Sequence, residues 1–279
     1  MILPQPGDAF EWMEAPGSAL VCRPLERFAR HFFTTRAWPL GSATAGSNLA
    51  SWNGVARAMD VEPAHLLRVH QVHGASVVVQ RTSESVVGGA DADIVLSNDP
   101  AVALAVQTAD CVPLLIADRR TSAIAAAHAG WRGTALGVAQ ATVRSIAREF
   151  GGRPSDLIVA IGPSIGPCCY EVGADVRARF DAAGFSEAEV ARWFLSEPQP
   201  SAANPLLGGL SNTSRPGHWF FDLWTATSDQ LIAAGVPHHQ IFGSELCTAS
   251  HPDAFCFHRR DGSRAGRMVA VIRKAEPQK

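Results

Sequence analysis

The sequence carries little charge and no long run of one sign, which excludes several classes of protein. Charged residues make up 18% of the 279 residues, with 24 basic and 26 acidic side chains and a formal net charge of -2. Disordered chains and nucleic-acid-binding proteins usually show a strong charge imbalance or charged runs. Because 47% of the residues are hydrophobic, we expect a folded protein that binds neither nucleic acid nor membranes.

The sequence also lacks the patterns that direct a chain to, or through, a membrane. No basic residue precedes Arg23, whereas a secretory signal needs a cationic start followed by an apolar run. The longest apolar runs, such as 101–106, fall far short of the roughly 20 residues that span a bilayer. We therefore expect a cytoplasmic protein whose six cysteines are reduced, buried, catalytic or metal-bound rather than paired.

The apolar pattern predicts a layered α/β or α+β fold, as a single domain over residues 1–279. Short, nearly continuous apolar runs are typical of strands buried on both faces. Strands followed by long helices indicate stacked layers of sheet and helix. We expect strands at 65–80, 94–96, 101–106, 112–117, 124–127, 158–161 and 268–272, and helices at 133–150 and 222–234.

One segment, 196–217, interrupts this pattern because it is rich in Pro, Gly, Ser and Asn. It follows a predicted short helix whose start is marked by a capping box, Ser186 with Glu189. Long stretches of turn-forming residues between regular elements are usually surface loops. We expect a mobile surface loop here.

Three separated segments place possible metal ligands at or near the ends of predicted strands. They contain His73, Cys111 and His128, and in each one polar donors interrupt an apolar run. Layered α/β folds tend to place their sites at such positions. One thiolate and two imidazoles suit zinc or copper, and three protein ligands leave a fourth position open for water or substrate.

The residue types alone leave a simpler interpretation open. A single Cys or His in an apolar strand is usually a small core residue or a hydrogen-bonded core polar group. The sequence has no CxxC or HExxH pattern, and spacing along the chain does not show that the three side chains converge.

Together with other motifs, these segments resemble the laccase-domain family, now regarded as purine nucleoside phosphorylases and formerly as multicopper polyphenol oxidases. So many matches in the same order argue against a chance resemblance. The matching motifs are QVHG at 71–74, ADAD at 90–93, TADCVP at 108–113, HAGWRG at 128–133, IGPSIGPCCYEV at 161–172, DLW at 222–224, CT at 247–248 and RRDG at 259–262.

The resemblance implies a fold, a metal site and an activity. The fold would be two mixed β-sheets flanked by helices, similar to the catalytic domain of cytotoxic necrotizing factors. In the family, the His of QVHG, the Cys of ADC and the His of HAGWRG bind the catalytic zinc. This implies that His73, Cys111 and His128 are the catalytic metal ligands here, with copper as the other possible metal.

The implied activity is phosphorolysis of purine nucleosides such as adenosine, inosine, guanosine and methylthioadenosine, so the implied partners are a purine nucleoside and phosphate. Family members are also credited with deaminating adenosine to inosine. A metal-bound phosphate could attack the ribose C1′, and a metal-bound water could attack C6 of adenine. A general acid must protonate the departing group. Asp110 is a weak candidate, because strand neighbours point to opposite faces.

Two departures from the family pattern bear on substrate preference and not on the metal. Arg36 and Asn48 remain of the N-terminal pattern, which implies a role in substrate binding, but Ala37-Trp38 replaces the usual Gly-Gly. Near the C-terminus, Phe257-His258 stands where the family more often has Ser-Tyr.

Two arginines are further candidates for binding substrate phosphate. Arg132 lies at a predicted helix start, where backbone N–H groups attract anions and a guanidinium can add a bidentate contact. Equally, Gly130 and Gly133 could only shape a tight turn that leaves Arg132 on the surface. Arg260 could also serve, although a charged pair before Asp261-Gly262 is more often an ordinary turn.

Cys168 and Cys169 are expected to be core thiols in a rigid turn rather than a redox pair.

Three other functions stay open. A copper-dependent polyphenol oxidase of the multicopper type needs many histidines, commonly as His-x-His pairs, and the sequence contains no such pair. A metal-free cysteine hydrolase would use Cys111 as nucleophile and His128 as base. A non-catalytic binding protein would need an exposed amphipathic helix or a charged patch, which the sequence does not show.

Overall fold

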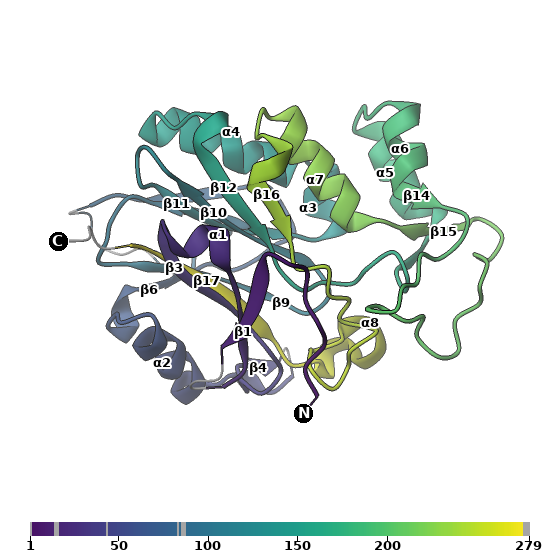
Figure 1. Ribbon diagram of the computed structural model, residues 1–279, viewed down its shortest axis with the longest axis horizontal. Coiled ribbons are helices and arrows are strands. Elements are labelled where there is room, and N and C mark those ends of the chain that lie inside the picture. The colour runs from purple at the N-terminus through teal and green to yellow at the C-terminus, as the bar shows by residue number, and fades with distance from the viewer. Residues whose placement is uncertain (1, 14–16, 43, 83, 85–87, 276–279) are drawn as a thin grey trace.

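A computed structural model describes residues 2–13, 17–42, 44–82, 84 and 88–275 of the chain. Across these residues, most strands belong to two six-stranded mixed sheets, which lie between layers of helices (Figure 1). The prediction of two mixed sheets flanked by helices is therefore confirmed. In the described chain, no helix is both long enough and apolar enough to cross a bilayer.

The first sheet is antiparallel except for one edge pair, β6 with β9. Its strands are, in spatial order, β1 (Phe10–Met13), β2 (Ala19–Cys22), β3 (Ala29–Thr34), β17 (Met268–Lys274), β9 (Ala103–Thr108) and β6 (Leu66–Arg68).

The second sheet is antiparallel at its centre and has a parallel pair at each edge. Its strands are, in spatial order, β16 (Ile241–Gly243), β12 (Leu157–Ile161), β10 (Val112–Asp118), β11 (Ile124–Ala129), β8 (Ile94–Ser97) and β7 (Val77–Gln80). Two small sheets accompany these large ones: β13 (Glu171–Gly173), β15 (His218–Phe221) and β14 (Phe194–Leu195) in the first, and β4 (Gly41–Ser42) with β5 (Gly46–Ser47) in the second.

The helices cover the outer faces of the two large sheets, with α4 and α7 above the second sheet and α2 below the first (Figure 1). The helices are α1 (Arg23–Glu26), α2 (Leu49–Ala58), α3 (Trp131–Ala135), α4 (Val138–Phe150), α5 (Ala174–Ala182), α6 (Glu187–Trp193), α7 (Leu223–Ala233) and α8 (His258–Asp261).

Strand β10 shows why these layers are stable. Successive side chains of a strand point to opposite faces, and Leu114 and Ile116 belong to the core under the helices, whereas Leu115 and Ala117 belong to the core between the sheets. All four are fully or almost fully buried. Each such side chain contributes roughly 1.5–3 kcal/mol of hydrophobic stabilisation when it is large and aliphatic.

The apolar run expected over 65–80 forms two strands, with the polar segment around His73 between them. The chain forms β6 in the first sheet, leaves it, and forms β7 in the second sheet. Residues 69–76 make the crossing, and His73 there has a left-handed backbone with φ of 60°. An apolar run cannot reveal this change of sheet, because both ends of the run read as strand.

The predicted helix over 133–150 is wrong, because it is two helices. Helix α3 starts earlier than predicted, at Trp131, and ends at Ala135. Gly137, whose φ of 73° is left-handed, separates it from α4. The sequence prediction also missed β1, β2, β3, α2 and α5.

Several other predicted elements are confirmed. The strands expected at 94–96, 101–106, 112–117, 124–127, 158–161 and 268–272 form with boundaries shifted by up to two residues. Helix α7 matches the predicted range 222–234 to within one residue at each end. Both hydrogen bonds of the Ser186–Glu189 capping box are present at the start of α6. Residues 196–217 form neither helix nor strand and connect β14 to β15.

Candidate metal centre

Three side chains from distant parts of the chain converge on one point. The ligand atoms of His73, Cys111 and His128 all lie within 4.8 Å of one another. His73 and Cys111 lie on two of the segments that cross from the first sheet to the second, after β6 and after β9, and His128 lies near the end of β11. His73 is exposed and His128 is buried, so the donor set reaches from the interior to the surface.

Asp93 holds the turn that carries His73. Its carboxylate is fully buried and accepts hydrogen bonds from the backbone N–H groups of Val72 (3.2 Å), His73 (3.1 Å) and Gly74 (2.6 Å). A left-handed backbone at a residue other than glycine persists only when its surroundings enforce it. The buried carboxylate supplies that enforcement here.

The same carboxylate also orients His128. The Nδ1 of His128 lies 2.8 Å from the Oδ1 of Asp93. Because an ionised carboxylate can only accept a hydrogen bond, Nδ1 carries the hydrogen and donates it to Asp93, and the Nε2 lone pair is left for a ligand. A carboxylate–histidine pair of this kind is the usual second layer around a protein-bound metal.

Gly130 allows the sulfur of Cys111 to approach the backbone. A Cβ atom at this position would lie 2.9 Å from Cys111 Sγ and 3.1 Å from His73 Cδ2. Real Cβ atoms are essentially never found as close as 2.9 Å to another heavy atom, so a side chain here would displace the Cys111 sulfur or the backbone and crowd the His73 ring. The HAGW motif therefore has a packing reason for its glycine.

The electrostatics of the cluster favour a thiolate. Burial raises the pKa of the Cys111 thiol, but the charge of His128 and the hydrogen bonds from His128 and His73 outweigh it and lower the pKa to about 6. Burial likewise opposes the charged form of His128, and Cys111 and Asp93 outweigh it, which raises the pKa of His128 to about 9. A bound cation would take the place of the His128 proton and keep the sulfur ionised.

The three donors open onto a cavity of about 270 Å³. Its wall also includes Gln71, His258 and Arg267. The Gln71 amide is held by the backbone of Gln107 through bonds of 2.8 Å and 2.7 Å. The three candidate metal donors, the Arg267 guanidinium and the His258 imidazole therefore surround a space that a ligand can enter.

The predicted substrate-binding residues lie outside the described wall of this cavity. Arg36 and Asn48 line a neighbouring cavity of about 580 Å³, and the segment 256–267 borders both. The side chain of Asn48 also caps α2 by accepting from the Ser51 N–H at 3.3 Å. Arg132 is exposed and stacks on Trp131, with its guanidinium carbon 4.4 Å from the ring centroid.

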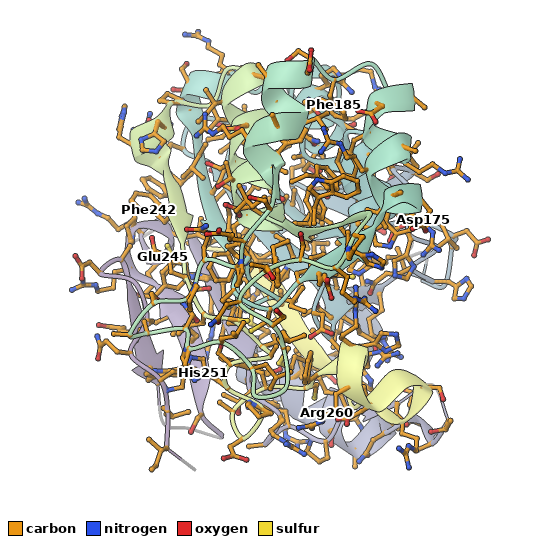
Figure 2. The ribbon with its side chains drawn as sticks, turned by 90° about the vertical axis from the view of Figure 1, so that its right-hand side faces the viewer. Asp175, Phe185, Phe242, Glu245, His251 and Arg260 are labelled. Carbon is orange, nitrogen blue, oxygen red and sulfur yellow. The ribbon has the colours of Figure 1, made fainter. Side chains whose placement is uncertain are left out.

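Arg260 lies on α8 at the surface (Figure 2) and is not part of the described cavity wall. Its guanidinium makes two hydrogen bonds with the Asp261 carboxylate, at 2.7 Å and 2.9 Å. This pairing occupies part of the guanidinium that would otherwise bind an anion.

Asp110 has a structural task next to Cys111. It lies in a turn with φ of 80°, so the expectation based on alternating strand neighbours does not apply to it. Its buried carboxylate accepts from Thr248 Oγ1 at 2.6 Å and from the Arg259 N–H at 2.7 Å. Burial raises the pKa of Asp110 to about 7. The residue ties two C-terminal segments to the loop that carries Cys111.

Sequence reasoning missed Asp93, His258 and Arg267 as members of this site. Asp93 lies in the ADAD motif and Phe257-His258 is a departure from the family pattern, so both carried a signal. Arg267 carried none, because it is one of several arginines in a short polar stretch.

The fold and the donor set define a class of two-sheet proteins with a candidate thiolate–imidazole metal centre. The chain belongs to the family described as multi-copper polyphenol oxidoreductase laccase, whose family model matches residues 48–275. The resemblance found in the sequence motifs is thereby confirmed.

Relatives and solved structures agree with this assignment. A purine nucleoside phosphorylase from Deinococcus radiodurans is 35% identical over 272 residues, which cover 93% of this chain and 94% of that protein. One from Bacteroides thetaiotaomicron is 34% identical over 180 residues, and the match covers 64% of this chain and 60% of that relative, less than two thirds of its length.

Two crystal structures share the fold over nearly the whole chain. YlmD from Geobacillus stearothermophilus has a TM-score of 0.75 and 32% identity, and covers 96% of this chain and 100% of that one. The hypothetical protein YfiH from Bacillus licheniformis has a TM-score of 0.81 and 26% identity, and covers 95% of this chain and 99% of that one.

Proposed function

We propose that this protein is a metal-dependent purine nucleoside phosphorylase. The observation that carries the proposal is the convergence of His73, Cys111 and His128 within 4.8 Å of one another at the wall of an open cavity. Relatives with 34% and 35% identity are named purine nucleoside phosphorylase, which supports the choice of reaction. The proposed substrates are adenosine, inosine, guanosine, methylthioadenosine and phosphate.

The donor set fits zinc, with copper as the second choice. Zinc binds cysteine sulfur at about 2.3 Å and histidine nitrogen at about 2.0 Å, and catalytic zinc sites keep one position open beside three protein ligands. His73, Cys111 and His128 would hold the ion, and Asp93 would orient His128. When bound, the metal supplies Lewis-acid activation of an oxygen ligand.

The remaining residues of the cavity would position the reactants. Arg267 can bind phosphate through charge-assisted hydrogen bonds. In phosphorolysis a phosphate oxygen forms a bond to the ribose C1′, the glycosidic C–N bond breaks, and the base nitrogen takes up a proton. We assign His258 as the donor of that proton, because it lines the cavity and imidazole is the side chain most often used for such transfers. Deamination of adenosine would use water in place of phosphate in the same cavity.

A single assay separates this proposal from its rivals. The purified protein is incubated with adenosine and phosphate while adenine, ribose 1-phosphate and inosine are followed. Phosphate-dependent formation of adenine and ribose 1-phosphate, lost in Cys111→Ala and kept in the control Cys22→Ala, supports the phosphorylase. Cys22 is a suitable control because it is buried in the first sheet, away from the three donors.

The lowered pKa of Cys111 favours one second candidate, a metal-free cysteine hydrolase. Turnover that requires Cys111 but survives removal of the metal by a chelator would support the hydrolase and contradict the phosphorylase. Activity on phenols alone, restored by copper, would contradict both and support the polyphenol oxidase.

A further inference from the structure

Three other cysteines form a second cluster that the proposed reaction does not use. The sulfur atoms of Cys168, Cys169 and Cys247 all lie within 4.8 Å of one another, and all three residues are buried. Cys168 and Cys169 lie in the turn before β13, and Cys247 follows β16, where it is bridged to Ser164. Two segments that are distant in sequence therefore bring three thiols to one point.

The cluster has a fourth potential donor in Ser250. Its hydroxyl oxygen lies 3.4 Å from the sulfur of Cys168 and 3.6 Å from the sulfur of Cys169. The Ser250 hydroxyl donates its hydrogen to the backbone oxygen of Pro205 at 2.7 Å. Because the hydrogen points to Pro205, the lone pairs of the oxygen are free to face the sulfurs.

One backbone donor in the cluster favours an ionised sulfur. The Gly166 N–H donates to the sulfur of Cys247 at 3.2 Å, a contact that stabilises a thiolate.

These spacings match a tetrahedral metal site with three sulfur ligands and one oxygen ligand. With metal–sulfur distances of about 2.3 Å and metal–oxygen distances of about 2.0 Å, tetrahedral geometry puts sulfurs about 3.8 Å apart and each sulfur about 3.5 Å from the oxygen. The measured sulfur–oxygen distances of 3.4 Å and 3.6 Å lie on either side of that value. The three sulfurs lie within 4.8 Å of one another.

We propose that Cys168, Cys169 and Cys247, with Ser250 as the fourth ligand, bind a thiophilic cation in a closed structural site. Zinc and monovalent copper share this preference for thiolates. The site differs from the His73 centre because its three cysteines are buried and four protein ligands would leave no open coordination position, so it would stabilise the fold rather than bind substrate.

The proposed cation would hold together the segments that support the first centre. Thr248, next to Cys247, donates to Asp110, and Asp110 precedes Cys111. On the other side, Asn204 in the segment 196–217 accepts from the Cys247 N–H at 2.7 Å and donates to the Glu245 carbonyl at 2.7 Å. In Figure 2, Glu245 lies above His251. The Nε2 of His251 lies 2.7 Å from the Ala203 carbonyl oxygen.

The test is the metal content of the full chain, purified under reducing conditions without chelator. Elemental analysis of the wild type should give two metal equivalents per chain and identify them as zinc or copper. Cys111→Ser should retain one equivalent, and Cys247→Ser should also retain one. Cys256→Ser is the matched control, because Cys256 is buried and outside both clusters, and it should retain two.

Cobalt substitution of Cys111→Ser keeps the test valid if Cys247→Ser fails to fold. A near-ultraviolet thiolate-to-cobalt absorption band in this variant, lost when Cys168→Ser is added, supports the second site. Two results would overturn the proposal: Cys111→Ser that binds neither zinc, copper nor cobalt, or a disulfide between Cys168 or Cys169 and Cys247 in peptides mapped without reduction.

Discussion

The carboxylate of Asp93 and the imidazole of His128 are joined by a 2.8 Å hydrogen bond in the interior of the protein. The same carboxylate accepts hydrogen bonds from three backbone N–H groups in the turn that carries His73. One buried acid therefore positions two of the three donors in the candidate metal centre. If these donors bind a metal, Asp93 determines how well they do so.

We expect Asp93→Asn to weaken metal binding by about 10- to 100-fold, the range seen when the carboxylate behind a ligating histidine is removed. The amide can present its NH₂ group to His128 Nδ1 and so favour the wrong tautomer. Competition with a chromophoric chelator measures the affinity.

Asp91→Asn is the matched control for this variant. Asp91 lies in the same ADAD motif but is exposed, and its carboxylate pairs with the exposed His70 at 2.7 Å. The control should bind metal like the wild type. Equal affinity in both variants would show that Asp93 does not position the donors.

Gly130→Ala should disturb the donors directly. Its Cβ would lie 2.9 Å from the Cys111 sulfur, so the sulfur or the helix start must move. We expect a fall in kcat/KM of about 100-fold, because small displacements at a reacting centre have effects of this order. Gly54→Ala in α2 is the control, since the nearest atoms to its Cβ lie 3.9 Å away. Unchanged turnover in Gly130→Ala would contradict the close approach.

Arg267→Gln tests the assignment of the phosphate-binding residue. Loss of a charge-assisted hydrogen bond costs about 1.5–3 kcal/mol, so the KM for phosphate should rise at least about tenfold while the KM for the nucleoside changes little. Arg264→Gln, three residues earlier, is exposed and outside the described cavity wall, and it should leave both values unchanged. A selective rise in the nucleoside KM would instead place Arg267 at the nucleoside.

His31 gives a pH dependence of stability that is independent of the candidate site. Burial lowers the pKa of His31 from 6.5 to about 4, although a hydrogen bond to the Ala29 carbonyl favours the charged form. Its Nε2 accepts from the Cys22 N–H at 2.9 Å, which requires the neutral ring. Between pH 6.5 and about 4 the unfolded chain therefore binds a proton that the folded chain does not.

Because the unfolded chain takes up this proton, the free energy of unfolding should fall as pH is lowered through this window. His31 accounts for about 3 kcal/mol of this fall in the free energy of unfolding. Urea denaturation at several pH values measures it as the difference between the wild type and His31→Gln. The exposed His65→Gln should keep the slope of the wild type. A parallel slope in His31→Gln would contradict the assignment.

The two crossings between the sheets explain where sequence prediction failed. The run over 65–80 is typical of strand at both ends, and the turn at His73 between them depends on Asp93, which lies twenty residues further along the chain. Similarly, the pairing of Asp110 with Thr248 spans 138 residues. Local patterns contain no information about such partners.

The sequence by itself determined the types of donor, the layered fold and most of the central strands, because apolar periodicity and residue chemistry are local properties of the chain. Only the tertiary structure decided which donors meet. His73, Cys111 and His128 come together because the chain changes sheet at two of them, and Cys247 joins Cys168 and Cys169 because a parallel bridge to Ser164 aligns their segments. Distances between residues far apart in sequence depend on how the sheets pack, and that packing follows from the whole chain.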